Sequence, residues 1–209
     1  MEKDMLGTVV KKIVNLPAAK LGVIYDLIEK LLSDAGQEWL VELKKFLRKE
    51  ICWAVKEVYA KIISEPLVID AVDGSEILVN ATDLFAYIDH DFKNWGADEP
   101  GQLTAETSVV AREMCNDATF VQIFGRLNPD VSKLCFTQHQ IRKFVTKYRD
   151  RLRSDSYATF FLFKSNNHIF VAIVRVNSSG RLSVNVRRFE DSEVWDAKNR
   201  CCLVVPQLT

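Results

Sequence analysis

The sequence has few of the residues from which secreted, membrane-spanning and metal-binding proteins are built. Its 209 residues include three histidines and five cysteines, the latter at positions 52, 115, 135, 201 and 202. The cysteine number is odd and the spacing irregular, so there is neither a disulfide framework nor a paired Cys-x-x-Cys zinc motif. No stretch approaches the roughly 18 apolar residues that cross a bilayer. We therefore expect no membrane association, no metal and no other cofactor.

Common enzyme motifs are missing as well. The chain has no glycine-rich phosphate loop, no Gly-x-Ser-x-Gly turn and no catalytic carboxylates at a recognisable spacing. Its first residues include Glu2 and Asp4 without a continuous apolar core, which does not fit a signal peptide. These absences favour a cytoplasmic protein of the non-enzymatic kind.

The charges are unevenly distributed although their sum is zero. Residues 1–65 carry 11 basic and 10 acidic side chains, residues 66–117 carry 2 and 11, and residues 118–209 carry 15 and 7. The apolar share of 48% and the charged share of 27% are ordinary for a globular protein. The middle segment therefore has an excess of nine negative charges (11 − 2) and the last segment an excess of eight positive ones (15 − 7).

The first 65 residues predict a helical region. Apolar residues recur at helical spacing in three stretches, 5–13, 18–32 and 39–62. Pro17 separates the first two, because proline removes an amide donor but suits the first turn of a new helix. Pro66 closes the region, and we expect regular strands only after it.

Residues 67–107 read as a hairpin, a short helix and a loop. Leu67–Ile69 and Ile77–Val79 flank Asp73-Gly74, a pair that supplies the positive φ angles of tight hairpin turns. Residues 80–83 offer an N-cap for a short helix that ends at Ile88. Residues 89–107 are polar, and a loop of this length is often functional or mobile.

The last hundred residues predict two helices and then strands. The helices are expected at 108–127, with a break near Asn116, and at 137–153. Phe160–Phe163 is a continuous apolar run, typical of a strand buried on both faces. Two further strands, 169–176 and 182–186, form a hairpin by the chemistry of the Asn-Ser-Ser-Gly turn between them, and 203–205 is a last strand.

These patterns predict an α+β fold with two regions. A helical N-terminal region, 1–65, precedes an α+β domain, 66–209. The domain is expected to contain a small, mainly antiparallel sheet of about four to six strands. The helices of residues 108–153 are expected to pack on one face of that sheet.

Several runs of residues carry a resemblance to a known family. They are Asp83-Leu84-Phe85, Tyr87-Ile88-Asp89, Asp91-Phe92-Lys93-Asn94-Trp95-Gly96-Ala97-Asp98, Gln122-Ile123-Phe124-Gly125, Thr159-Phe160-Phe161-Leu162-Phe163-Lys164 and Val204-Val205-Pro206-Gln207-Leu208. The chain resembles a family of uncharacterised proteins from uncultured bacterial lineages with small genomes. The likeness covers about residues 67–209, and residues 16–22 are similar to leaders in the same group. It implies relatives and no activity, since the family has no known function.

Two short motifs are compatible with ligand binding but have simpler explanations. Asp89-His90-Asp91 contains metal-ligand types, yet three adjacent side chains converge poorly on one ion, and a solvated turn explains them. Asn80-Ala81-Thr82-Asp83, which follows the expected hairpin, faintly resembles the opening of phage-type KilA-N DNA-binding domains. Its simpler explanation is an ordinary helix cap.

Cys115 and His168 follow each other in the order of papain-like thiol enzymes. That chemistry needs a thiolate activated by a histidine, with a third group such as Asn185 or Asp191 to hold the ring. Acidic neighbours on both sides of Cys115 disfavour its thiolate. A cysteine-dependent hydrolase is thus an alternative, and a buried structural cysteine is the preferred interpretation.

A basic helix is the strongest candidate for a binding site. Its cations, opposed only by Asp150, are Arg142, Lys143, Lys147, Arg149, Arg151 and Arg153. Such a surface can bind the phosphates of nucleic acid, unless it is a solvated face or is covered by the acidic segment 66–117. We expect the acidic loop 89–107 to lie on the opposite face. The resulting hypothesis is a non-enzymatic binding module with a protein or a nucleic acid as its partner.

Overall fold

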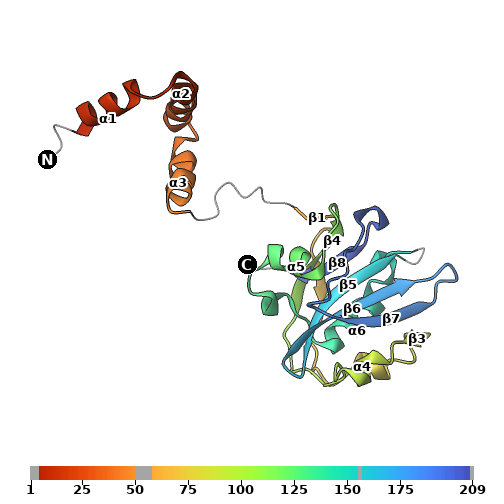
Figure 1. The fold of residues 1–209 in the computed structure, drawn as a ribbon. Helices are drawn as coiled ribbons and strands as arrows, with labels where there is room; N and C mark the ends of the chain where they lie inside the picture. Colours follow the sequence, from red (N-terminus) through yellow and green to blue (C-terminus); the bar gives the residue numbers. More distant parts are fainter. Residues whose placement is uncertain (1–4, 50–57, 155–156, 208–209) are drawn as a thin grey trace. The chain divides into compact units, whose positions relative to one another are not determined.

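Helices form the N-terminal part of the chain, as the apolar spacing predicted. The computed structural model describes residues 5–49, 58–154 and 157–207. The chain divides into two compact units, residues 1–56 and 57–209, which are described separately (Figure 1). The first unit contains α1 (Met5–Val14), α2 (Ala18–Leu32) and α3 (Gly36–Leu47). Pro17 precedes α2 in an extended conformation, and its carbonyl accepts the hydrogen bonds of the first turn.

A strand occupies the end of the region that was expected to be helical. Residues 60–62 form β1 (Ala60–Ile62), which pairs antiparallel with β4 (Thr107–Met114). The helical prediction is therefore wrong for residues 58–62, and residues 50–57 lie outside the described part. Pairing with a strand some fifty residues away is not visible in local periodicity. Because β1 pairs with β4, the second unit begins before Pro66.

The second unit is built on one sheet of eight strands. Its order is β1-β4-β8-β5-β6-β7-β3, and β2 also pairs with β4. The remaining bounds are β2 (Leu67–Ile69), β3 (Tyr87–Ile88), β5 (Ala158–Ser165), β6 (His168–Val176), β7 (Leu182–Arg188) and β8 (Cys202–Pro206). Among the described strands, only the pairs β3–β7 and β5–β8 are parallel. The predicted α+β class and mainly antiparallel sheet are confirmed, with more strands than expected.

The predicted helix over residues 108–127 is half strand. Residues 107–114 form β4, whose buried and β-branched residues lie between β8 and the short strands β1 and β2. Only α5 (Phe120–Leu127) is helical there. Thr119 begins α5 with a capping box, in which its hydroxyl accepts from the Gln122 amide and the Gln122 side chain accepts from the Thr119 amide.

The predicted hairpin over residues 67–79 is also wrong. Residues 67–69 form β2, but they pair with β4, and Leu78–Asn80 forms the 3₁₀-helix η1. Gly74 does adopt a positive φ of 79° in the turn. Residues 80–88, expected to be helical, form turns and then β3, which pairs with β7 beside α4 (Asp91–Asn94; Figure 1). Residues 70–106 thus form one long connection between β2 and β4, which we call the strap, rather than a local hairpin.

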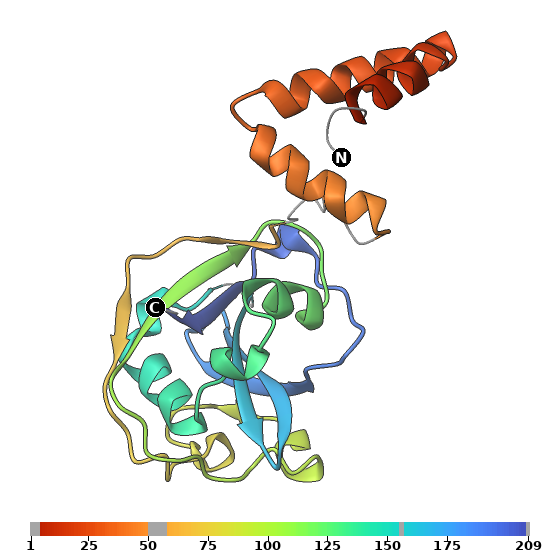
Figure 2. The same ribbon diagram turned by 90° about the vertical axis from the view of Figure 1, so that its left-hand side faces the viewer.

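Helices cover both faces of the sheet, not one. Successive residues of β5 point to opposite faces, so Phe160 and Phe161 mark the two sides. The ring of Phe120 in α5 meets Phe160 at 5.2 Å between centroids, while Phe144 in α6 (Gln138–Lys147) meets Phe161 at 5.3 Å. The helices therefore lie on opposite sides (Figures 1 and 2). The prediction of a single helical face is wrong, whereas the central strand Phe160–Phe163 is confirmed.

The smaller elements complete these layers. They are η2 (Val131–Leu134), η3 (Arg149–Arg151) and η4 (Ala197–Asn199). The C-terminal strands agree with their prediction, since β6 and β7 form a hairpin through residues 177–180 and β8 is the last strand. Gly180 supplies a positive φ of 75° in that turn.

Truncation of a core ring tests this architecture. Phe160 is fully buried in contact with Phe120 and Trp195, so Phe160→Ala should lower the free energy of unfolding by about 3–5 kcal/mol. Val121→Ala, at an exposed position on α5, is the control and should change it by less than about 0.5 kcal/mol. Both are measured by urea unfolding. Equal losses in the two variants would contradict the central position of β5.

Candidate functional site

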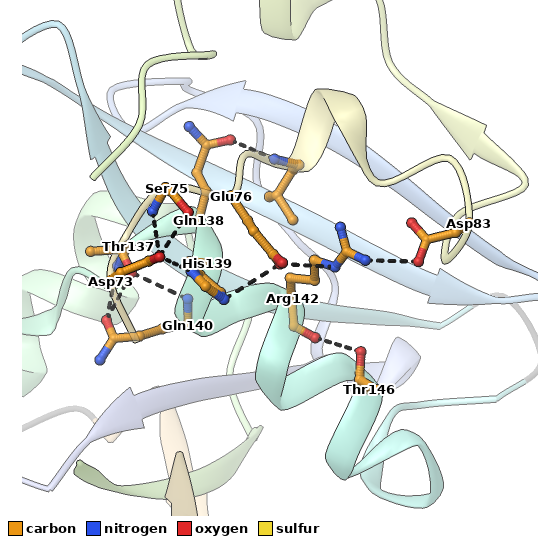
Figure 3. Close-up of polar contacts among 11 residues, drawn as sticks. Asp73, Ser75, Glu76, Asp83, Thr137, Gln138, His139, Gln140, Arg142 and Thr146 are labelled. Carbon is orange, nitrogen blue, oxygen red and sulfur yellow. Dashed lines mark hydrogen bonds and ion pairs between the residues drawn. The ribbon is translucent and has the colours of Figure 1, made fainter. Parts of the chain in front are cut away.

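The cations on one side of α6 are paired with carboxylates of the acidic segment. Arg142 Nε lies 3.1 Å from Glu76 Oε2, and Arg142 Nη2 lies 2.7 Å from Asp83 Oδ2 (Figure 3). Lys147 Nζ lies 2.8 Å from Asp70 Oδ1 and also donates to the Val68 carbonyl at 3.1 Å. Residues 70–83 of the strap thus lie along the helix, and their carboxylates pair with Arg142 and Lys147.

Other members of the predicted basic surface have partners as well. Arg149 Nη2 donates to the Gly180 carbonyl at 2.6 Å, and Arg151 Nε lies 3.3 Å from Asp150 Oδ2. Arg153 binds Glu113. Lys143 is exposed. Residues 70–83 and 113, rather than the loop 89–107, thus supply the carboxylates that pair with Arg142, Lys147 and Arg153. The basic face is partly covered, other members of it are exposed, and nucleic-acid binding stays a prediction.

A buried histidine lies at the centre of the contact between α6 and the strap. The side chain of His139 is 9% exposed, with Nδ1 3.0 Å from Asp73 Oδ1 and Nε2 3.4 Å from Glu76 Oε2 (Figure 3). The amide and hydroxyl of Ser75, followed by His139, hold the pKa of Asp73 below its usual range. The arrangement ties the strap to the helix, and among the described residues His139 Nε2 has no hydrogen-bond partner.

The glutamines on either side of His139 complete that contact. The Gln138 side chain accepts from the Leu78 amide at 3.0 Å and donates to the Glu99 carbonyl at 2.9 Å. Gln140 accepts from the Thr137 amide in a capping box and donates to the Thr107 hydroxyl. Sequence reasoning missed this role. The available signal was the polar run Gln-His-Gln at the start of a helix, because polar side chains that are buried there need hydrogen-bond partners.

Cys115 and His168 are not brought together. Cys115 follows β4 near the Ala158 end of β5, because Glu113 pairs with Cys202 and Cys202 pairs with Thr159. His168 pairs with Ser165 at the other end of β5. At about 3.3 Å per residue, the two ends of this strand are roughly 23 Å apart. The geometry does not support the cysteine-dependent hydrolase.

The thiols differ in exposure. Cys115 is exposed, contrary to the expectation of a buried structural residue, and its Sγ lies 3.0 Å from the Val58 carbonyl oxygen. Burial raises the pKa of Cys135 to about 12 and also raises the pKa values of Cys201 and Cys202.

The Asp89-His90-Asp91 motif forms a turn with its own hydrogen bonds. Asp89 accepts from Asn185 Nδ2 at 3.1 Å and from the Asp91 amide at 3.2 Å. Burial by itself would raise the pKa of Asp89, but these hydrogen bonds, with the charge of Arg187, hold it below its usual range. Within the described ranges, no three His, Cys, Asp or Glu side chains gather as a metal site.

A buried carboxylate gathers cations at the β1 end of the sheet. Glu113 Oε2 binds Arg153 and lies 3.1 Å from Arg200 Nη2, and Oε1 lies 3.8 Å from Lys61 Nζ. Burial would raise the pKa of this carboxyl group. The hydrogen bond from Arg200 and the positive charges around it outweigh that effect and hold the pKa below its usual range. Three cations around one carboxylate leave two positive charges in excess.

The N-terminal helices leave most of their apolar side chains uncovered. Among the residues of this unit whose burial is described, only Gly36 is buried. Large exposed apolar residues occur on all three helices, namely Val10, Val14, Val23, Tyr25, Ile28, Leu32, Val41, Phe46 and Leu47. In the part of the chain that the structure describes, no helix is long and apolar enough to cross a membrane.

Comparison with known proteins does not add a family. No protein-family model, no curated protein and no solved structure matches the chain.

Lowering the pH should reduce the free energy of unfolding, because Glu113 then becomes protonated. Because the folded-state pKa of this group is lowered, its contribution is complete above the ordinary glutamate pKa of about 4.3 and is lost as the pH falls through the lowered value. Glu113→Gln should cost about 3 kcal/mol of unfolding free energy at neutral pH and less in acid. The exposed Glu106→Gln is the control. A Glu113→Gln deficit that stays constant with pH would contradict the assignment.

Thiol labelling tests the separation of Cys115 from His168. A maleimide should modify Cys115 in the folded protein before the less exposed Cys135, Cys201 and Cys202. His168→Ala should leave the Cys115 labelling rate and its pH profile unchanged, because the two groups lie at opposite ends of β5. A fall of about tenfold or more in that rate would show that His168 activates the thiol.

Proposed function

We propose that the protein is a cytoplasmic, non-enzymatic binding module that self-associates through its N-terminal helices. The observation that carries this proposal is the exposure of large apolar side chains on α1, α2 and α3. Leu32 is 79% exposed and Phe46 is 60% exposed. Folded proteins rarely leave so many apolar groups in water without a partner for them.

The composition of α2 supports the same conclusion. In Ala18–Leu32 the charged residues Lys20, Asp26, Glu29 and Lys30 lie on one half of the helix, and most of the large apolar residues lie on the other. An amphipathic helix of this kind normally buries its apolar face against other protein. The half-buried residues of α2 include Leu21, Ile24, Leu27 and Leu31, so its more exposed apolar residues remain for a partner.

Charge favours a second copy over nucleic acid as that partner. The 11 basic and 10 acidic side chains of residues 1–65 nearly cancel, so two copies meet without strong repulsion. A phosphate backbone, by contrast, requires an excess of free cations. In a symmetric dimer, moreover, the same apolar surface is buried on both chains.

Light scattering after size-exclusion chromatography of the full chain tests self-association. We expect the mass of a dimer or larger assembly. Leu32→Glu with Phe46→Glu should lower the association constant by at least about tenfold, because burying an unpaired carboxylate is costly. Gln37→Glu, which adds one negative charge at an exposed polar position of α3, is the matched control for the single variants Leu32→Glu and Phe46→Glu.

Other outcomes would contradict the proposal. A monomer at every concentration would exclude self-association, and sedimentation of that monomer with anionic vesicles would assign the helices to a membrane surface instead. An equal effect of Gln37→Glu would show that added charge, rather than lost apolar contact, separates the chains.

A further inference from the structure

The outermost strand β1 has hydrogen-bonding groups that point away from the sheet. Its register pairs Lys61 with Glu113, and the Ile63 and Cys115 amides donate to the Ala111 and Tyr59 carbonyls. Hydrogen-bonded pairs alternate along antiparallel strands, so the N–H and C=O groups of Ala60 and Ile62 point outward. Among the described residues, only Arg112 Nη1 reaches one of them, the Ala60 carbonyl at 3.5 Å.

The neighbouring edge strand β2 is covered, in contrast to β1. Its Val68 amide donates to the Tyr148 hydroxyl at 3.1 Å, and the Val68 carbonyl accepts from Tyr148 at 2.8 Å and from Lys147 at 3.1 Å. Side chains at the end of α6 thus take the place of a further strand. Edge strands are commonly protected in such ways. On β1 the protection is limited to its three-residue length, Lys61 and the Arg112 contact, so it offers a template for a short added strand.

Two adjoining hollows lie beside β1. One has a volume of about 480 Å³ and the other about 200 Å³, and both are lined by Ile63, Ser64 and Arg151. Ile62 and Leu67 add apolar surface to the larger hollow, and Ile62 is 56% exposed. A β-branched apolar residue exposed beside unpaired backbone groups suits an added strand, whose alternate side chains need a pocket.

The charges along β1 indicate the chemistry of its partner. The cluster of Lys61, Arg153 and Arg200 around Glu113 has two positive charges in excess. At the Leu67 end of the larger hollow, Glu65 adds a negative charge. Asp150 lies next to Arg151 and offsets it. An acidic residue is therefore favoured near Lys61 and disfavoured near Glu65.

We propose that β1 binds an extended segment of a partner protein, which adds to the sheet as a further strand. The segment alternates apolar and small polar residues and has acidic residues at the end that lies near Lys61. A second copy of β1 is a poor occupant, because antiparallel self-pairing would bring two Lys61 side chains together. This site uses residues of the second unit and does not depend on self-association of the N-terminal helices.

Fluorescence anisotropy with a designed pair of peptides tests the site on the full chain. The probe is a short labelled peptide that alternates valine and threonine and ends in a pair of glutamates, and its control ends in lysines. We expect the glutamate peptide to bind at least about tenfold more tightly. Lys61→Glu should abolish that preference, while Lys143→Glu, the same change at an exposed position of α6, should keep it.

Hydrogen exchange supplies a measurement that does not require a variant to fold. Addition of the glutamate peptide should slow exchange of the Ile62 amide and leave the β7 amides unchanged. Titration of Leu32→Glu/Phe46→Glu should give the parent affinity, which separates this site from the helical one. Failure of both peptides to bind, equal binding of the two, an equal effect of Lys143→Glu, or an unprotected Ile62 amide would overturn the proposal.

Discussion

The fully apolar run Phe160–Phe163 is the constraint on which the second unit depends. All its side chains are buried, and they alternate between the two faces of β5. Neither face of the sheet can then be left in water. The α5 layer covers one face and the α6 layer, with the strap of residues 70–106, covers the other. Burial of rings on both sides makes β5 the centre of the unit.

The same constraint explains why the cations of α6 pair with carboxylates of the strap. To cover its face, α6 must lie against the sheet with its polar side toward the strap, and the strap carries acidic residues. Arg142 and Lys147 therefore meet Glu76, Asp83 and Asp70 within one chain. Ion pairs between exposed groups contribute little stability each, so this pairing mainly fixes the position of the strap. As a consequence, Arg142 and Lys147 are engaged within the chain, whereas Lys143 is exposed.

Sequence reasoning succeeded where local pattern determines structure. The run Phe160–Phe163, the turn before Leu182 and the helices after Pro17 and Thr137 all carry local signals. It failed at residues 107–114, where an apolar stretch fits either a helix or a buried strand until its partners are known. It identified the strand Leu67–Ile69 but assigned it the wrong partner, because β2 pairs with the distant β4 and residues 78–80 form a 3₁₀-helix.

For the candidate sites, the sequence showed which cations cluster but not which carboxylates pair with them. Six basic residues within twelve positions are visible in one dimension, whereas the carboxylates opposite them come from residues 70–83 and 113. The free edge of β1 was hidden in a stretch that resembled a helix. The exposed faces of α1 to α3 could not be foreseen either, because apolar periodicity predicts a helix and does not say what covers it.

The central claim is that a second copy of the chain covers the N-terminal helices. Hydrogen exchange of the α2 and α3 amides, followed in the full chain over a wide range of protein concentration, tests it most directly. Helices this short are marginal alone, so their amides should be protected at high concentration and should exchange rapidly on dilution. The amides of β5 should stay protected throughout. Protection of α2 and α3 that does not change with concentration would contradict the account.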